Sequence, residues 1–371
     1  MISRTHVPLR TSCRWNRKPT HEDERMKSNV WQTTVLLLLA VVFSVALTYA
    51  TVELPHTMSS ALIDQMGDAT GPDFDYETGL SQHFIDSYHI RFIGTCCLIL
   101  VAALIVFGLF VERSSLSSLG AVALFLPVFG HFALSMSMLA GLGMLRVIWM
   151  PLVELAPGLL RLGDIAFVPY MVTVYVPALA GIDVRIFLIY GLMGFGIALF
   201  VLGVLVWLQA RFRCEDLASK SIYRFSRHPQ YLGWIVWTYG LMIYVSRLPG
   251  PRIMWSVESS LPWLIATVAI ICVARLEEIK LGREQGPAYS EYEKGTPFLL
   301  PLPRLVSRIV SAPMRLVLRK DRPRSGRDVV IVFVLYSGIL IALSIPFAIF
   351  DWPAREQAMW IGFPYDVPPF R

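Results

Sequence analysis

The strongest constraint on this chain is a set of long apolar runs that contain almost no charged side chains, such as VLLLLAVVFSVAL from Val35. A helix needs about 20 mostly apolar residues to cross the hydrocarbon core of a bilayer, and several runs reach that length. Only 16% of the 371 residues are charged and the mean hydropathy is +0.56. Soluble domains carry about 25% charged residues. We therefore predict an all-α polytopic membrane protein.

The apolar runs predict about seven transmembrane helices. The expected spans are 31–52, 90–112, 118–145, 186–210, 230–247, 257–276 and 329–350. Residues 164–183 are also apolar, but Pro169 and Pro177 interrupt them, so we predict that this stretch does not span. An eighth span or a re-entrant segment is the alternative there.

The charges of the loops orient these spans, because Lys and Arg concentrate in cytosolic loops. The N-terminal arm and residues 275–328 are basic, whereas residues 53–87 contain no Lys or Arg. This pattern predicts a cytosolic N-terminus and a C-terminal tail outside the cytosol. The net charge of +6 lies beside apolar segments, so we expect no nucleic-acid partner.

Cysteine and histidine placement indicates neither a disulfide framework nor a metal site, since no CxxC or Cys/His ligand spacing occurs. The five cysteines are Cys13, Cys96, Cys97, Cys214 and Cys272. His131 stands alone in an apolar run of the first half. We interpret it as a neutral histidine bonded to a neighbouring helix, with a functional role as the alternative.

Composition divides the chain into five parts. Residues 1–29 are predicted to form a basic cytosolic arm, and residues 30–185 an N-terminal transmembrane bundle of unknown role. The residues that could carry chemistry fall in 186–303. A basic cytosolic linker at 304–328 and a last helix with an outer tail at 329–371 complete the chain.

Two short blocks flank the helical hairpin predicted at 230–247 and 257–276. The first block reads YRFSRHPQYLGW from Tyr223, and the second begins with RLEE at Arg275 and ends in GTPFLLP. The hairpin places both blocks at one membrane face. Taken singly, each residue also fits a structural role; Pro229, for example, suits the first turn of a helix.

Two adjacent carboxylates, Glu277 and Glu278, lie at the predicted membrane boundary, where charge is costly unless it meets cations. Arg275 shares a helix face with Glu278, which leaves Glu277 to project elsewhere. Across the hairpin, His228 and Tyr231 offer hydrogen-bond donors and aromatic faces. Together these side chains predict a cytosolic pocket for a charged, planar cofactor.

The paired blocks resemble the signature of the isoprenylcysteine carboxyl methyltransferase and phospholipid methyltransferase families. That signature reads G-x-Y-x-x-x-R-H-P-x-Y-x-G, then, after a helical hairpin, E-E-x-x-L-x-x-x-F-G-x-x-Y-x-x-Y. The resemblance covers about 85 residues, from Leu217 to Pro301. Ser221 stands where the pattern has its first glycine, and Gln285 stands where it has phenylalanine.

The resemblance implies a membrane methyltransferase that uses S-adenosylmethionine without a Rossmann domain and takes a lipid or lipid-modified substrate from the membrane. It implies catalytic roles for Arg275 and Glu278 and no metal. The implied cofactor contacts are Tyr223, Arg227, His228, Pro229, Gln230, Tyr231, Gly233, Glu277, Tyr289 and Tyr292. We expect a bacterial inner membrane, or the endoplasmic reticulum in a eukaryote, with the active site on the cytosolic face. The oligomeric state is left open.

The implied reaction is an in-line methyl transfer, in which the protein contributes positioning and desolvation. An amine substrate would need a base, such as a glutamate or His228, whereas a carboxylate or thiolate would not. Two alternatives stay open. One is an NADPH-dependent sterol-reductase-like enzyme, whose family shares an R-H-P-x-Y block, and the other is a non-catalytic membrane protein with a vestigial pocket.

Overall fold

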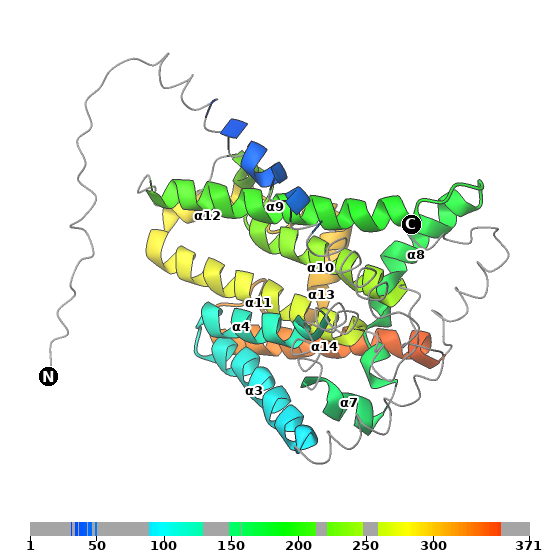
Figure 1. Ribbon diagram of the computed structural model, residues 1–371. Helices are drawn as coiled ribbons and strands as arrows, with labels where there is room; N and C mark the ends of the chain where they lie inside the picture. The colour runs from blue at the N-terminus through cyan, green and yellow to red at the C-terminus, as the bar shows by residue number, and fades with distance from the viewer. Residues whose placement is uncertain are drawn as a thin grey trace, which may run out of the picture.

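Every regular element in the described part of this computed structural model is a helix (Figure 1). The structure describes scattered positions between 31 and 49 and the ranges 89–128, 148–156, 158–212, 221–247 and 259–349. The predictions for the N-terminal arm, the acidic loop, His131, Cys13, Cys214 and the C-terminal tail lie outside these residues.

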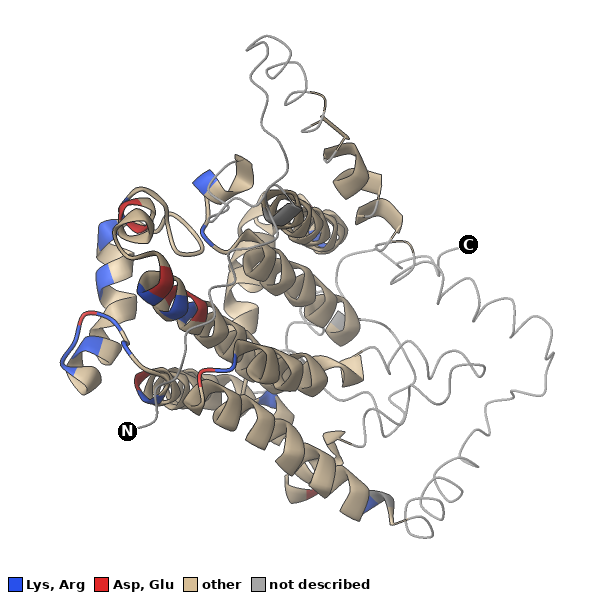
Figure 2. Ribbon diagram, turned by 90° about the vertical axis from the view of Figure 1, so that its left-hand side faces the viewer, with Lys and Arg blue, Asp and Glu red and all other residues tan. Residues whose placement is uncertain are grey.

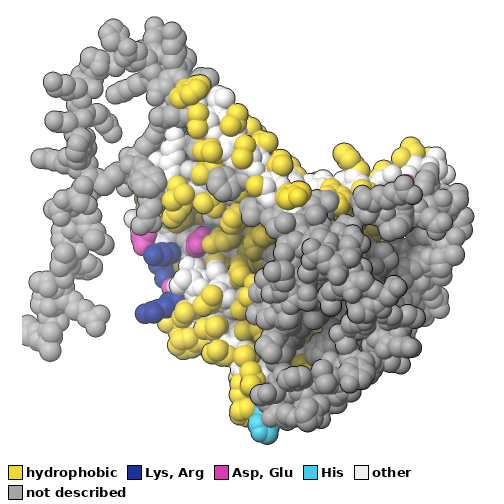
Figure 3. All heavy atoms as spheres, in the orientation of Figure 1, with side chains coloured by type: hydrophobic (Ala, Val, Ile, Leu, Met, Phe, Trp, Pro, Cys, Tyr) yellow, Lys and Arg dark blue, Asp and Glu magenta, His cyan; other side chains and the backbone are white. Residues whose placement is uncertain are grey.

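Three helices are long and apolar enough to cross a membrane: α3 (Ile90–Phe110), α9 (Arg185–Phe212) and α14 (Gly326–Ile349). Their bounds lie within three residues of three predicted spans. Hydrophobic side chains cover much of the described surface in Figure 3. The chain is thus helical and of membrane type. The described residues do not establish seven spans. The spans predicted at 31–52 and 118–145 lie partly outside them, and the helices at 230–247 and 257–276 are not among the three that qualify.

Helix α4 (Ser114–Phe125) returns along α3 after a tight turn in which Glu112 adopts a left-handed φ of 59°. The two helices are held closely, since Ser117 Oγ donates a hydrogen bond to the carbonyl of Ile105 at 2.9 Å. A Cβ on Gly120 would lie 2.8 Å from Ile105 Cγ1. Helix α4 starts at Ser114, four residues before the predicted span at 118–145.

Helices α9 and α10 (Pro229–Arg247) also approach closely along their length. Glycines face the partner helix from both sides, at positions Gly196, Gly203, Gly233 and Gly240. A Cβ on Gly233 would lie 2.3 Å from the backbone nitrogen of Phe200. Small residues of this kind let two helix backbones pack against each other.

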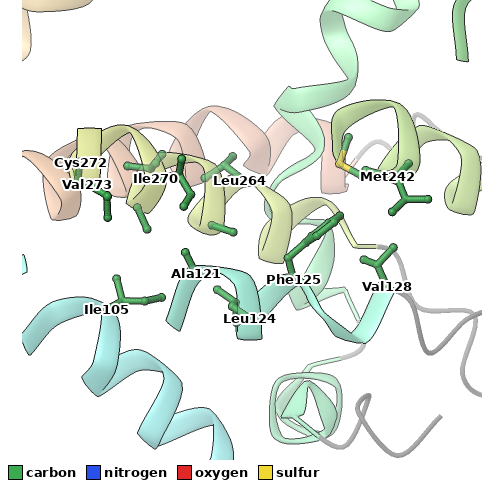
Figure 4. Close-up of a cluster of buried hydrophobic side chains, with 14 of the residues drawn as sticks. Ile105, Ala121, Leu124, Phe125, Val128, Met242, Leu264, Ile270, Cys272 and Val273 are labelled. Carbon is green, nitrogen blue, oxygen red and sulfur yellow. The ribbon is translucent and has the colours of Figure 1, made fainter. Parts of the chain in front are cut away.

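Helix α11 (Ser260–Gln285) lies between α10 and the layer formed by α4 and α14 (Figure 1). Its apolar side chains, such as Leu264 and Ile270, face Ala121 and Phe125 of α4 in a shared core (Figure 4). The helix continues nine residues past the end of the predicted span at 276, because residues 277–285 contain no Pro and only one Gly. It ends at Gly286, whose φ is 54°.

The stretch predicted not to span forms a 3₁₀ turn η5 (Asp164–Phe167) followed by α8 (Val168–Ala178). Eleven helical residues extend about 16 Å, roughly half of the ~30 Å hydrocarbon core. Two short elements precede it, α7 (Met150–Leu155) and η4 (Leu159–Arg161). The buried Asp164 accepts a hydrogen bond from Ser260 at 2.6 Å, which ties this region to α11.

The remaining elements are η6 (Ser221–Arg224), α12 (Pro287–Gly295) and α13 (Arg304–Leu318). Figure 2 views the molecule from the side on which α12 lies in Figure 1, and the ribbon colours show charged residues gathered at that end. The same end appears as a patch of charged side chains in Figure 3. Helices α3 and α4 pack against α11. The division of the chain into five parts stays a prediction.

Candidate functional site

The two sequence blocks meet at the charged end of the molecule. The first block forms η6 and the start of α10, and the second forms the end of α11 and α12. The Arg227 backbone N–H donates a hydrogen bond to the carbonyl of Pro297 at 3.0 Å. The Tyr292 hydroxyl donates to the carbonyl of Tyr223 at 2.7 Å. The hairpin thus brings the blocks together through backbone atoms of both.

The turn before α10 is fixed by internal hydrogen bonds. Tyr223 is buried, and its hydroxyl lies 2.9 Å from Gln230 Oε1 and 3.3 Å from the carbonyl of Gly203. Ser221 has a left-handed φ of 54°, a conformation that favours glycine, so the glycine of the family pattern has a physical basis. Pro229 begins the helix as predicted. Tyr223 and Gln230 therefore use their polar atoms to hold the turn against α9.

Glu277 faces the first block from the middle of the long helix. Tyr231 donates a hydrogen bond to Glu277 Oε1 at 2.6 Å, and His228 Nδ1 lies 3.9 Å from Oε2. The rings of His228 and Tyr231 stack with centroids 5.7 Å apart. Burial raises the pKa of Glu277, and the contacts with Tyr231 and His228 oppose that rise. Because its side chain is still 33% exposed, this carboxylate can be reached from outside.

Glu278 projects to another side of α11 and meets three cationic or protonatable groups. Arg227 Nη1 lies 2.8 Å from its Oε1, and Arg275 Nη1 donates to its Oε2 at 2.7 Å. His228 Nε2 lies 3.6 Å from Oε1, just beyond hydrogen-bonding distance. Burial alone would raise the pKa of Glu278, but these three partners outweigh it and lower the pKa to about 2. The pKa values of the neighbouring carboxylates Glu277 and Glu278 are thus shifted in opposite directions.

Phe298 is a site residue that the sequence reasoning did not assign. The Arg275 guanidinium carbon lies 3.6 Å from the centre of its ring, which is a cation–π geometry. The ring also meets His228 edge-on, with centroids 5.3 Å apart. Its position directly after Thr296-Pro297, at the close of the second block, is the signal that could have drawn attention to it.

Glu293 and Arg322 were also missed. Arg227 Nη1 lies 3.0 Å from Glu293 Oε1, and the Arg322 guanidinium contacts the same oxygen. Arg322 comes from the segment predicted as a plain basic linker. No sequence pattern connects it with the two blocks, so only the folded chain shows this contact.

A cavity of about 420 Å³ lies between α11, α12 and the segment that follows α13. Among the predicted site residues, Arg275, Glu278 and Tyr289 line it. The other lining residues are Ile279, Gly282, Arg283, Gly286, Ser290, Glu293, Asp321, Arg322, Pro323 and Arg324. Tyr223, His228, Gln230, Tyr231 and Glu277 are not among them. The predicted cofactor contacts are thus distributed over two adjoining regions, with His228 and Arg227 reaching Glu278 from behind the cavity wall.

Several buried polar atoms of this region have no hydrogen-bond partner among the described residues. They include Arg227 Nε, His228 Nε2 and Tyr289 Oη. Buried polar atoms in folded proteins nearly always find a partner in protein or water. Tyr289 lines the cavity, so its unpartnered hydroxyl lies where a polar ligand could bind.

Two of the predicted contacts have packing roles. Gly233 lies against the backbone of Phe200 in α9 and allows the close helix pair. Tyr292 holds η6 through its hydroxyl and meets the Tyr289 ring edge-on at 6.3 Å. The structure therefore places Gly233 at the α9–α10 interface and Tyr292 beside, but not on, the lining of the cavity.

Residues 207–296 match a family described as a protein of unknown function, DUF1295. The match covers 90 of the 371 residues and includes both blocks up to Thr296. This family is associated with steroid 5α-reductase-like and methyltransferase-like membrane proteins. Comparison with curated proteins and with solved structures finds no match. The chain is thus a membrane-type helical protein with a DUF1295 domain.

Proposed function

We propose that the chain is an integral-membrane methyltransferase that uses S-adenosylmethionine and acts on a lipid or lipid-modified substrate. In this proposal it has about seven spans, a cytosolic N-terminus and a cytosolic site. The observation that carries the proposal is that the pKa values of two adjacent carboxylates, Glu277 and Glu278, are shifted in opposite directions beside a cavity. Pairs of titratable groups whose pKa values are pushed apart are a hallmark of sites that perform acid–base chemistry.

The donors and acceptors of the site fit this cofactor. The cavity volume of about 420 Å³ falls within the roughly 300–1,000 Å³ of small-molecule sites. Arg275 can pair with the carboxylate of an amino-acid moiety. The Glu278 carboxylate, and the Tyr289 hydroxyl, which lacks a hydrogen-bond partner among the described residues, can bond its ammonium or ribose hydroxyl groups. When bound, the cofactor would supply an electrophilic methyl group.

The two carboxylates fit different roles in methyl transfer. Glu278 stays ionised and is held by Arg227 and Arg275, so it is suited to fix the position of a cationic ligand. Glu277 is partly exposed and has a raised pKa, which suits a group that accepts a proton from an amine substrate. Tyr231 and His228 would orient Glu277 through the contacts described above.

Calorimetric binding of S-adenosylmethionine to the purified full-length protein in detergent tests this proposal. We expect binding to the wild type and a loss of affinity in Tyr289→Phe on the order of 5- to 100-fold, since only the unpartnered hydroxyl is removed. Tyr175→Phe on α8, whose side chain is exposed, is the matched control and should bind as the wild type does. We expect His228→Ala to abolish binding.

The alternatives give different results in the same experiment. Binding of NADPH without binding of S-adenosylmethionine would replace the proposal with a reductase. Binding of neither would favour a non-catalytic protein. If S-adenosylmethionine binds, incubation with methyl-labelled cofactor and lipid extracts should transfer label to a lipid-soluble product.

A further inference from the structure

Helix α13 (Arg304–Leu318) has no buried residue and carries all of its charge on one side. On a helix with 3.6 residues per turn, Arg304, Arg308 and Arg315 fall within about 40° of one another. Arg315 Nη2 donates hydrogen bonds to the carbonyl of Arg308 at 3.0 Å and to Ser311 Oγ at 2.9 Å. These bonds hold the guanidinium along this basic face. The helix contains no Asp or Glu.

An exposed apolar stripe made of Leu305, Ile309 and Leu316 runs along α13 about 100° around the helix from the arginines. These side chains are 69%, 63% and 79% exposed, and their spacing of four and seven residues places them on one side of the helix. A soluble helix turns such residues towards a core, because apolar surface in water is unfavourable. Here the stripe is left exposed by the described residues, so an apolar environment is expected to cover it.

The position of α13 indicates what covers the stripe. Only seven residues separate Leu318 from Gly326, where the membrane-type helix α14 begins. The Tyr336 hydroxyl of α14 donates a hydrogen bond to the carbonyl of Val310, which holds the two helices together. Helix α13 is therefore kept beside the N-terminal half of a helix that is long and apolar enough to cross the bilayer.

We propose that α13 lies in the interfacial layer of the membrane, with its apolar stripe among the acyl chains and its basic face on anionic phospholipid headgroups. A helix with a strong apolar side and arginines along the polar side is suited to this layer, since both halves of its surface find a matching phase. Clustered arginines next to a spanning helix attract anionic lipids, and their long side chains reach the headgroups from a buried backbone.

This placement has a consequence for the cavity. The segment directly after α13 supplies Asp321, Arg322, Pro323 and Arg324 to the cavity lining. Anchoring of α13 to headgroups therefore fixes one wall of the cavity at the membrane surface. The inference does not depend on the proposed methyltransferase activity, because it rests on the exposed faces of α13 alone.

Spin-label accessibility in lipid nanodiscs tests the proposal with the full chain. One label is attached through Ile309→Cys on the apolar stripe and another, separately, through Ser307→Cys on the polar side, in a background in which all five native cysteines are replaced by serine. The nanodiscs contain phosphatidylcholine alone or phosphatidylcholine with phosphatidylglycerol. In the mixed discs we expect collisions of the 309 label with lipid-soluble oxygen to exceed those of the 307 label several-fold. The water-soluble relaxation agent should show the reverse order.

The dependence on anionic lipid is tested with Arg304→Gln, Arg308→Gln and Arg315→Gln combined in one chain. With the arginines intact, we expect the difference in oxygen accessibility between the 309 and 307 labels to be larger in discs with phosphatidylglycerol than in discs without it. In the triple variant, we expect this difference to be the same in both kinds of disc. Water accessibility of both labels in the mixed discs would overturn the proposal. So would a 309 label inaccessible to both agents, which would indicate a protein cover. The comparison of the 309 and 307 labels in the mixed discs uses chains with intact arginines. A folding defect of the triple variant would therefore not affect it.

Discussion

Tyr231 and Glu277 are joined by a 2.6 Å hydrogen bond across α10 and α11, although they lie 46 positions apart in the chain. The bond couples the two sequence blocks at the one carboxylate of the pair that is partly exposed. It also opposes the rise in the pKa of Glu277 that burial causes. Burial and a contact between helices therefore act in opposite directions on the pKa of Glu277.

Removal of this hydrogen bond by Tyr231→Phe should raise the pKa of Glu277 further, because the bond from Tyr231 stabilises the ionised carboxylate. A cationic cofactor favours ionised Glu277, so its affinity falls as the pH drops through that pKa. We expect calorimetric titrations of S-adenosylmethionine to lose affinity at a higher pH in the variant than in the wild type. An unchanged pH profile would show that Tyr231 does not control Glu277.

Protonation of Glu278 should destabilise the fold in acid. Its folded-state pKa of about 2 lies below the unfolded value, which is about 4.3. The resulting stability is present above that unfolded value and is lost as the pH falls towards 2. We expect the melting temperature of the wild type in detergent to drop below about pH 5, and more steeply than that of Glu278→Gln. Glu284→Gln, exposed on the same helix, should follow the wild type; equal slopes for all three would contradict the assignment.

Loss of the buried Arg227 side chain should be costly, because Glu278 and Glu293 both lie within 3.0 Å of its Nη1 atom. Breaking a buried ion pair on one side typically costs about 3–5 kcal/mol. We expect Arg227→Met to lower the melting temperature by several degrees. Arg224→Met, at an exposed position of η6, should change stability by less than about 0.5 kcal/mol. Similar melting temperatures for the two variants would argue against the buried network.

A methyl group at Gly233 should separate α9 from α10, because its Cβ would lie 2.3 Å from the backbone nitrogen of Phe200. Such overpacking costs about 1–3 kcal/mol, so we expect Gly233→Ala to melt at a lower temperature than the wild type. Gly191→Ala on α9 is the matched control, since a Cβ there meets nothing within 4 Å. The packing argument fails if the two alanine variants are equally stable in detergent.

The helices with the clearest apolar runs could be predicted closely from the sequence. Helix α10 begins at Pro229, where proline suits the first turn, and α14 begins three residues before the predicted span. Helix α11 continues nine residues beyond the predicted span at 257–276, because that span was bounded by the apolar run and not by a helix-ending residue. A helix that leaves the membrane-type region can continue while its residues are good helix formers, and here Gly286 ends it.

The site was predicted only in part for a related reason. Spacing within each block identified Arg227, His228, Tyr231 and the two glutamates, and the structure brings these residues together. Phe298 reaches the same cluster from the close of the second block, and Arg322 from a segment without a recognisable pattern. Their roles depend on how the chain returns after α12 and α13, which no local periodicity encodes.

The sequence by itself determined that the chain forms apolar helices, that its charges gather at their ends, and that two blocks flank a hairpin. Hydrophobic runs and helix-starting residues act locally, so they can be read along the chain. Only the tertiary structure decided which partners from other elements Glu277 and Glu278 meet, and how far each is buried. They are neighbours of identical chemistry, but a rotation of about 100° on α11 turns one towards Tyr231 and the other towards Arg227 and Arg275. Burial and those partners then push their pKa values in opposite directions.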